Sequence, residues 1–137
     1  MESQVIKKIL YGVVVGMISL NVFAAETIYC YAKLECAADN DIRTCERIGE
    51  KAGIWASATP VIIGSLKKGT HTLKGAFFHD RSRFPGTCDY GSVVLNTSQR
   101  VYAHSLPDKP SQWARGRNRD ERVCHSSNPS ECEFIRY

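Results

Sequence analysis

Several short patterns that mark common exported enzymes and metal proteins are missing from this sequence. No two cysteines are separated by two residues, and no histidine pair has zinc-finger spacing. Because zinc sites and thiol oxidoreductases both use Cys-x-x-Cys pairs, their absence disfavours both classes. The sequence also lacks a Gly-x-Ser-x-Gly segment, which disfavours a serine hydrolase with a nucleophile elbow. We therefore predict no metal site and no cofactor.

The one long apolar stretch is too short to span a membrane, and it predicts a signal peptide instead. A spanning helix needs about 20 strongly apolar residues, whereas the centre of a signal peptide needs only about 7–15. The apolar segment Leu10–Leu20 follows two lysines. Val22 and Ala24 fit the small-x-small cleavage pattern, so we expect a signal peptide at residues 1–24 and a mature chain from Ala25. An uncleaved anchor is the alternative.

The remaining residues, 25–137, predict a single disulfide-stabilised domain with no membrane span. No internal repeat, low-complexity tract or linker-like Gly/Ser run interrupts them. They carry 16 Lys and Arg against 13 Asp and Glu, a net charge of +3 that by itself names no partner. An even number of cysteines behind an export signal is typical of disulfides formed in an oxidising compartment. These cysteines are Cys30, Cys36, Cys45, Cys88, Cys124 and Cys132.

Alternating side chains from Thr27 to Cys36 predict a strand with one buried face. Both Cys30 and Cys36 belong to the apolar set of this alternation. At roughly 3.3 Å per residue, the two cysteines would lie about 20 Å apart, far beyond disulfide reach. Every connectivity that contains a Cys30–Cys36 bond is therefore excluded.

Among the remaining connectivities, the spacing of the cysteines favours one set. The two C-terminal cysteines are close in sequence, and Asn128-Pro129 between them can turn the chain. A helix around Cys45 would bring that residue back to the end of the predicted strand. The other connectivities without a Cys30–Cys36 bond remain open. The favoured bonds are Cys124–Cys132, Cys36–Cys45 and Cys30–Cys88.

The rest of the chain predicts a β-rich domain with one short helix. Asp39-Asn-Asp41 is a helix-start signal, and apolar residues follow it at helical spacing, so we expect a helix at about 41–51. Residues 106–118 are mostly loop formers. The expected fold is α+β or mostly β, a small antiparallel sheet with one short helix, stabilised by disulfides. Its expected strands are 60–66 paired with 70–78 as a hairpin, 92–96 paired with 100–104, and a last strand at 133–137.

A histidine with two nearby arginines, His79 with Arg81 and Arg83, is the densest group of chemically useful side chains. A metal-independent ribonuclease needs two histidines as base and acid and a cation that stabilises the phosphorane. His79 could meet His104 or His125 across strands to form such a site. Histidines that are merely exposed or packed are the alternative interpretation.

A second basic group, between residues 115 and 122, predicts an anion-binding loop. Such a loop could bind phosphate, sulfate or carboxylate groups of nucleic acid, lipopolysaccharide or an acidic protein. Trp113 just upstream offers an aromatic surface on which a ligand could stack. Asp120 and Glu121 lower the net charge of the run, and a solvated loop with internal ion pairs is the alternative. The four arginines are Arg115, Arg117, Arg119 and Arg122.

A set of short features spans the predicted mature chain: Tyr29-Cys30, Cys36, Cys45, Gly69-Thr-His-Thr-Leu73, Cys88-Asp-Tyr90, Leu106-Pro-Asp108, Trp113 and Cys124…Cys132-Glu-Phe134. This layout resembles small cysteine-containing exported proteins of gammaproteobacteria, a group with no assigned activity. The resemblance implies an exported location and disulfides, and it transfers no active-site residue.

From the sequence we therefore expect a periplasmic or secreted protein whose function is non-enzymatic binding. The loops at 79–90 and 105–122 are the expected contact surface, since binding residues concentrate on loops held by a rigid scaffold. A small secreted hydrolase, above all a metal-independent nuclease, is the alternative function.

Overall fold

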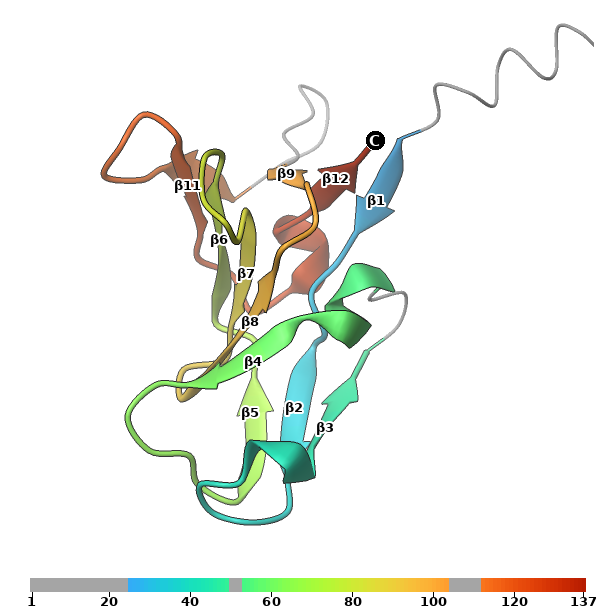
Figure 1. The fold of residues 1–137 in the computed structure, drawn as a ribbon, viewed down its shortest axis with the longest axis vertical. Helices are drawn as coiled ribbons and strands as arrows, with labels where there is room; N and C mark the ends of the chain where they lie inside the picture. Colours follow the sequence, from blue (N-terminus) through green and yellow to red (C-terminus); the bar gives the residue numbers. More distant parts are fainter. Residues whose placement is uncertain (1–24, 50–52, 104–111) are drawn as a thin grey trace, which may run out of the picture.

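The computed structural model describes residues 25–49, 53–103 and 112–137 of the chain. Within these ranges it contains twelve β-strands and three short 3-10 helices, and none of the described residues lies in an α-helix. The strands form three sheets, and every strand pair is antiparallel (Figure 1). The prediction of a small, mostly β, disulfide-stabilised fold is confirmed.

The largest sheet has six strands and carries the residues of the candidate site at one end. Strands that are neighbours in this sheet come from distant parts of the chain. In order across the sheet they are β10 (Trp113–Arg115), β11 (Glu121–Cys124), β6 (Gly75–His79), β7 (Gly86–Asp89), β8 (Val93–Thr97) and β4 (Thr59–Ile62).

Two three-stranded sheets complete the fold. One sheet has the order β3 (Cys45–Ile48), β2 (Lys33–Cys36), β5 (Gly69–Thr72). The other has the order β1 (Glu26–Ile28), β12 (Phe134–Arg136), β9 (Tyr102–Ala103). The 3-10 helices are η1 (Ile42–Thr44), η2 (Gly53–Ser57) and η3 (Pro129–Glu131).

The core is built from the apolar faces of these sheets around Trp55 of η2. Trp55 is fully buried, and its ring packs against Phe134 of β12 with 5.3 Å between the ring centroids. In β8 the alternation of the sequence matches the burial, because Val93 and Leu95 are buried while Val94 between them is partly exposed. Period-two patterning thus places one face of β8 in the core.

Two glycines allow segments of the core to approach one another closely. A Cβ atom on Gly75 of β6 would clash with the carbonyl oxygen of Cys124 on β11. A Cβ atom on Gly86 of β7 would lie 2.9 Å from Cγ2 of Val101 and 3.1 Å from the Trp55 ring. Both positions therefore exclude every residue with a side chain unless the neighbours move.

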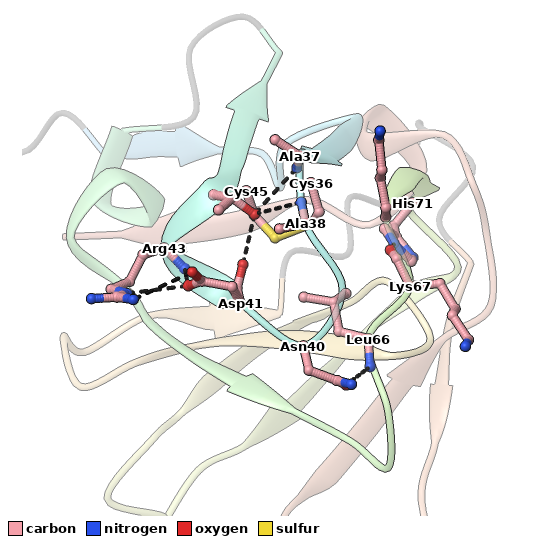
Figure 2. The surroundings of a disulfide bond; sticks show 12 residues. Cys36, Ala37, Ala38, Asn40, Asp41, Arg43, Cys45, Leu66, Lys67 and His71 are labelled. Carbon is pink, nitrogen blue, oxygen red and sulfur yellow. Dashed lines mark hydrogen bonds and ion pairs between the residues drawn. A yellow bond between two sulfur atoms is a disulfide. The ribbon is translucent and has the colours of Figure 1, made fainter.

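All three favoured disulfides are confirmed. Cys30–Cys88 joins the segment after β1 to β7, and Cys124–Cys132 joins β11 to the residue after η3. Cys36–Cys45 joins β2 to β3 at positions that lie directly opposite each other (Figure 2). No cysteine is left unpaired among the described residues, which include all six cysteines of the sequence.

The predicted strand over 27–36 is divided in two. The chain leaves the sheet of β1 after Ile28 and enters the sheet of β2 at Lys33. The segment between them is held by a contact from a distant part of the chain. The hydroxyl of Tyr90 donates a hydrogen bond of 2.8 Å to the carbonyl of Tyr31. Burial raises the pKa of this phenol well above its usual value, so it stays a donor. Ala32, predicted to face the core, is exposed.

The predicted helix at 41–51 is wrong. Asp41 does act as an N-cap, with its carboxylate accepting from the backbone N–H of Arg43, but it caps a single 3-10 turn. The Arg43 side chain also binds this carboxylate and lowers the pKa of Asp41. Cys45 then begins β3, which pairs with β2, so sheet pairing and the disulfide override the local helical pattern (Figure 2). Residues 50–52 lie outside the described part of the chain.

Both predicted hairpins are wrong, and the predicted strand at 70–78 is divided into β5 and β6, which belong to different sheets. β4 pairs with β8 and β5 pairs with β2, while β8 pairs with β7 and β4, and β9 pairs with β12. The turn after Leu66 moves the chain between sheets, because the buried Leu66 is anchored through its N–H to the Asn40 side chain (Figure 2). Of the predicted loop at 106–118, residues 113–115 form β10, and those up to 111 are not described. The last strand is confirmed as β12.

Candidate functional site

The two basic groups identified in the sequence lie at the same end of the six-stranded sheet. β6 and β11 are antiparallel neighbours with His79 opposite Glu121, so the loops after His79 and before Glu121 emerge together (Figure 1). The N–H of Asp80 donates to the carbonyl of Asp120, and the Arg81 guanidinium lies 3.6 Å from the Asp120 carboxylate. These contacts bring residues 79–83 against the loop between β10 and β11.

Arginine dominates this part of the surface, which we call the arginine-rich end. Three carboxylates, Asp80, Asp120 and Glu121, lie among seven arginines and leave a formal net charge of +4. Because residues 25–137 together carry only +3, the positive charge of the predicted mature chain is concentrated here. The arginines of this end are Arg81, Arg83, Arg100, Arg115, Arg117, Arg119 and Arg122.

The carboxylates of this end are already engaged by neighbours. The Asp80 carboxylate lies 3.8 Å from the Arg100 guanidinium, which also donates to the Asp80 carbonyl. The Glu121 carboxylate accepts from the Asn118 side chain at 3.0 Å and lies 3.7 Å from Nε2 of His79. Each pair is at least partly exposed to solvent, so these contacts are worth at most about 1 kcal/mol apiece.

Two arginines face each other directly across the β10–β11 hairpin. Arg115 is the register partner of Arg122. The backbone N–H of Gly116 donates to the carbonyl of Glu121, so the preceding pair, Arg115 and Arg122, is a non-hydrogen-bonded one. Side chains approach most closely in such pairs, and like charges directly opposite one another are destabilising.

Most of the loop arginines are free to bind a partner. Arg122 is partly committed, since it donates to the backbone carbonyls of residues 119 and 121 at 3.0 and 2.8 Å. Arg115, Arg117 and Arg119 are exposed, and their guanidinium groups have no hydrogen bond or ion pair with any residue that the structure describes. An anion could therefore approach three guanidinium groups that no described residue engages.

A pocket of about 310 Å³ opens between this loop and β9. Its aromatic wall comes from Phe78 of β6 and Tyr102 of β9, whose ring centroids lie 6.1 Å apart. The Tyr102 ring also contacts that of Tyr137, at 5.8 Å. The remaining lining residues are Asp80, Ala103, Arg119, Asp120 and Arg122.

Trp113, predicted as a stacking surface, packs partly against the core in the structure. Its Nε1 donates to the carbonyl of Glu133 at 2.8 Å, and its ring lies 5.1 Å from that of Phe134 in an edge arrangement. The indole is partly buried and fixes the edge strand β10 to the core. A role in ligand stacking stays a prediction, and Tyr102 and Tyr137 are two exposed rings near this end.

His79 and His125, the two candidate nuclease histidines that the structure describes, lie too far apart to act together. His125 follows Cys124, which is opposite Ala76, so it lies about four residues, or about 13 Å, along β6 from His79. His71 lies on β5 in another sheet, where its Nε2 is 2.7 Å from the Lys67 carbonyl. His104 lies outside the described residues, so its pairing with His79 stays a prediction.

Sequence reasoning missed the aromatic wall and Arg100. Phe78 and Tyr102 meet only because β9 pairs with β12 while β6 pairs with β11, and neither pairing has a local sequence signal. Arg100 was noticed only as part of a predicted strand. Its contact with Asp80 spans 20 residues and depends on the same arrangement.

Comparisons with protein-family models, curated proteins and solved structures give no significant match. Three disulfides fit an extracellular or periplasmic protein. No helix in the described part of the chain is long and apolar enough to cross a membrane. The same part contains no group of three or more His, Cys, Asp or Glu placed to hold a metal ion. The predicted signal peptide at 1–24 lies outside the described residues.

Proposed function

We propose that this chain is an exported, non-enzymatic binding protein that takes an anionic partner at the arginine-rich end. The observation that carries the proposal is the direct opposition of Arg115 and Arg122 on β10 and β11. Two like charges so placed lower the stability of the hairpin unless something neutralises them. A bound anion would neutralise them, and the unpaired guanidinium groups of the connecting loop would add to the attraction.

The size of the effect follows from the number of unpaired arginines. A hydrogen bond to a charged group contributes about 1.5–3 kcal/mol, and less where solvent and salt screen it. Replacing Arg115, Arg117 and Arg119 with alanine should therefore weaken binding by several kcal/mol in total, at about three such bonds. The loss should shrink as salt rises, because screening already weakens the wild-type contact.

The test measures retention of the mature domain on heparin, RNA, lipopolysaccharide and anionic vesicles at low salt. The matched control replaces three exposed lysines elsewhere, Lys67, Lys68 and Lys74, and so removes the same formal charge. We expect the arginine variant to elute earlier than wild type and the lysine variant to elute nearly with it. Equal retention of the two variants on every member of the panel would contradict the proposal.

A stability measurement separates a binding role from a structural one. Arg115→Ala relieves the repulsion with Arg122, so its free energy of unfolding should equal or slightly exceed that of wild type, by less than about 1 kcal/mol. Binding should nevertheless weaken. A variant that loses stability together with binding would show that Arg115 supports the hairpin rather than a ligand.

A further inference from the structure

A row of aromatic rings runs beside the arginine-rich end. Phe78, Tyr102 and Tyr137 follow one another with ring centroids 6.1 and 5.8 Å apart. Tyr102 is 38% exposed and Tyr137 is 84% exposed. The row therefore presents ring surface to solvent instead of contributing only to the core. Two neighbouring exposed rings of this kind form a surface on which planar groups can stack.

The aromatic row and the arginines share one pocket. Arg119 and Arg122 line the same space of about 310 Å³ as Phe78 and Tyr102. That volume lies at the lower end of the range of about 300–1,000 Å³ for small-molecule sites, so it suits a single flat unit of a ligand. A ligand here would meet positive charge and aromatic ring surface at the same time.

The two carboxylates in the pocket do not exclude such a ligand. Asp80 and Asp120 line it, but each lies near an arginine outside the lining set, Arg100 at 3.8 Å and Arg81 at 3.6 Å. Their charge is thus balanced locally. Carboxylate oxygens can also accept hydrogen bonds from the exocyclic amino groups of nucleobases.

These features discriminate among polyanions. Single-stranded nucleic acid combines regularly spaced negative charges with flat π-faces, and proteins bind it through a basic groove with aromatic side chains on which bases stack. A duplex hides the faces of its bases inside the stack. Sulfated glycans and lipid phosphates carry the charge but no flat π-face. The aromatic row would make no stacking contact with those ligands.

We propose that the arginine-rich end binds single-stranded nucleic acid, with phosphates on Arg115, Arg117 and Arg119 and a base stacked on Tyr102 in the pocket. This inference rests on the proposed function and adds the class of ligand to it. Stacking on an aromatic side chain contributes about 1–3 kcal/mol per base, so loss of the Tyr102 ring should weaken binding about 5- to 150-fold.

The test measures fluorescence anisotropy of a labelled mixed-sequence oligonucleotide of about 12 nucleotides, within the usual site sizes of about 4–16 nucleotides. The oligonucleotide is used single-stranded as DNA and as RNA, and annealed as a duplex, with heparin retention measured in parallel. Tyr102→Leu keeps apolar bulk but removes the ring, and Tyr102→Phe is the matched control that keeps it. We expect the leucine variant to bind single strands at least about fivefold more weakly, and the phenylalanine variant to match wild type.

Duplex binding and heparin retention should be unchanged in both Tyr102 variants, because neither ligand offers a base to stack. Unchanged single-strand affinity of Tyr102→Leu, with polyanion binding still lost in the triple arginine variant, would overturn this inference and leave the proposed function standing. Tighter binding of the duplex than of the single strands by the wild-type protein would overturn it too. If the triple arginine variant still binds both the oligonucleotide and heparin as wild type does, the proposed function is refuted instead.

Tyr137→Leu keeps the test decisive if the Tyr102 variant fails to fold. Tyr137 is 84% exposed, so its replacement should leave the fold intact. Because the Tyr137 ring packs against that of Tyr102 at 5.8 Å, we expect its loss to weaken single-strand binding in the same direction and to leave heparin retention unchanged. If Tyr102→Leu does not fold, and a folded Tyr137→Leu variant binds single strands as tightly as wild type, the inference is overturned.

Discussion

Removal of the Cys30–Cys88 disulfide should cost more stability than removal of either other bond. Its cysteines are separated by 58 residues, against 9 for Cys36–Cys45 and 8 for the C-terminal bond. In the chain-entropy model a cross-link stabilises by reducing the freedom of the unfolded chain, and the effect grows with the logarithm of loop length. For these separations the model gives about 4 kcal/mol for the long loop and about 2.5 kcal/mol for each short one.

Relative to the Cys36–Cys45 bond, the packing around the long-range disulfide adds to this difference. Cys30 is 2% exposed and Cys88 is fully buried in the middle of the six-stranded sheet, so replacing both with alanine also leaves unfilled space in the core. Cys45, in contrast, is only partly buried. The double-alanine variant that lacks Cys30–Cys88 should therefore be less stable than the one that lacks Cys36–Cys45 by about 1.5 kcal/mol or more.

Urea unfolding of the three double-alanine variants measures these differences. Far-UV circular dichroism and the fluorescence of the buried Trp55 should report a single coincident transition for each variant. A domain of this size is stable by about 5–15 kcal/mol, so a loss of about 4 kcal/mol can be measured without unfolding every variant. The reasoning is refuted if the loss of Cys30–Cys88 destabilises the protein no more than the loss of Cys36–Cys45 does.

Two further substitutions test how separate elements are joined. Arg47 of β3 donates to the carbonyls of Trp55, Ala56 and Ala58 at the end of η2, so Arg47→Ala should lower the free energy of unfolding by about 2–3 kcal/mol, with part of the loss restored by lysine. An Arg47→Ala midpoint in urea equal to that of wild type would contradict this. Gly86→Ala should cost about 1–3 kcal/mol by overcrowding the core, measured the same way, and a neutral result would mean that the neighbours yield freely.

The disulfides could be predicted because two of the three join cysteines that are close in sequence. Apolar alternation through Cys30 and Cys36 excluded their mutual bond, and that exclusion holds even though the strand is divided in two. Close spacing then suggested the two local bonds, and the third followed by elimination. The helix invoked to return Cys45 does not exist, because a 3-10 turn and antiparallel pairing return it instead.

Strand pairing could not be predicted, because it depends on contacts between distant segments. The sequence marks most strands through β-branched runs and turn residues, but it does not say that β4 pairs with β8 or that β5 pairs with β2. Consecutive strands were assumed to form hairpins. Here the buried Leu66 and its bond to Asn40 fix the segment that carries the chain from one sheet to another.

The same distinction applies to the candidate site. The arginines between 115 and 122 are adjacent in sequence, so their density was visible at once. Their closeness to Arg81 depends on the pairing of β11 with β6, and the aromatic wall depends on the position of β9. The opposition of Arg115 and Arg122 depends on the register of one hairpin, which a shift of one residue would abolish.

That opposition raises the question of how the hairpin remains folded while it holds two like charges. Cys124 at the end of β11 is bonded to Cys132, and Trp113 at the start of β10 donates to the Glu133 carbonyl and packs against Phe134. A disulfide and a partly buried, hydrogen-bonded indole together contribute several times the roughly 1 kcal/mol cost of an exposed like-charge pair. The backbone of the hairpin is therefore held in place before a ligand arrives. An anion that binds there orders only the exposed arginine side chains, so the affinity should follow charge and salt concentration rather than folding of the hairpin.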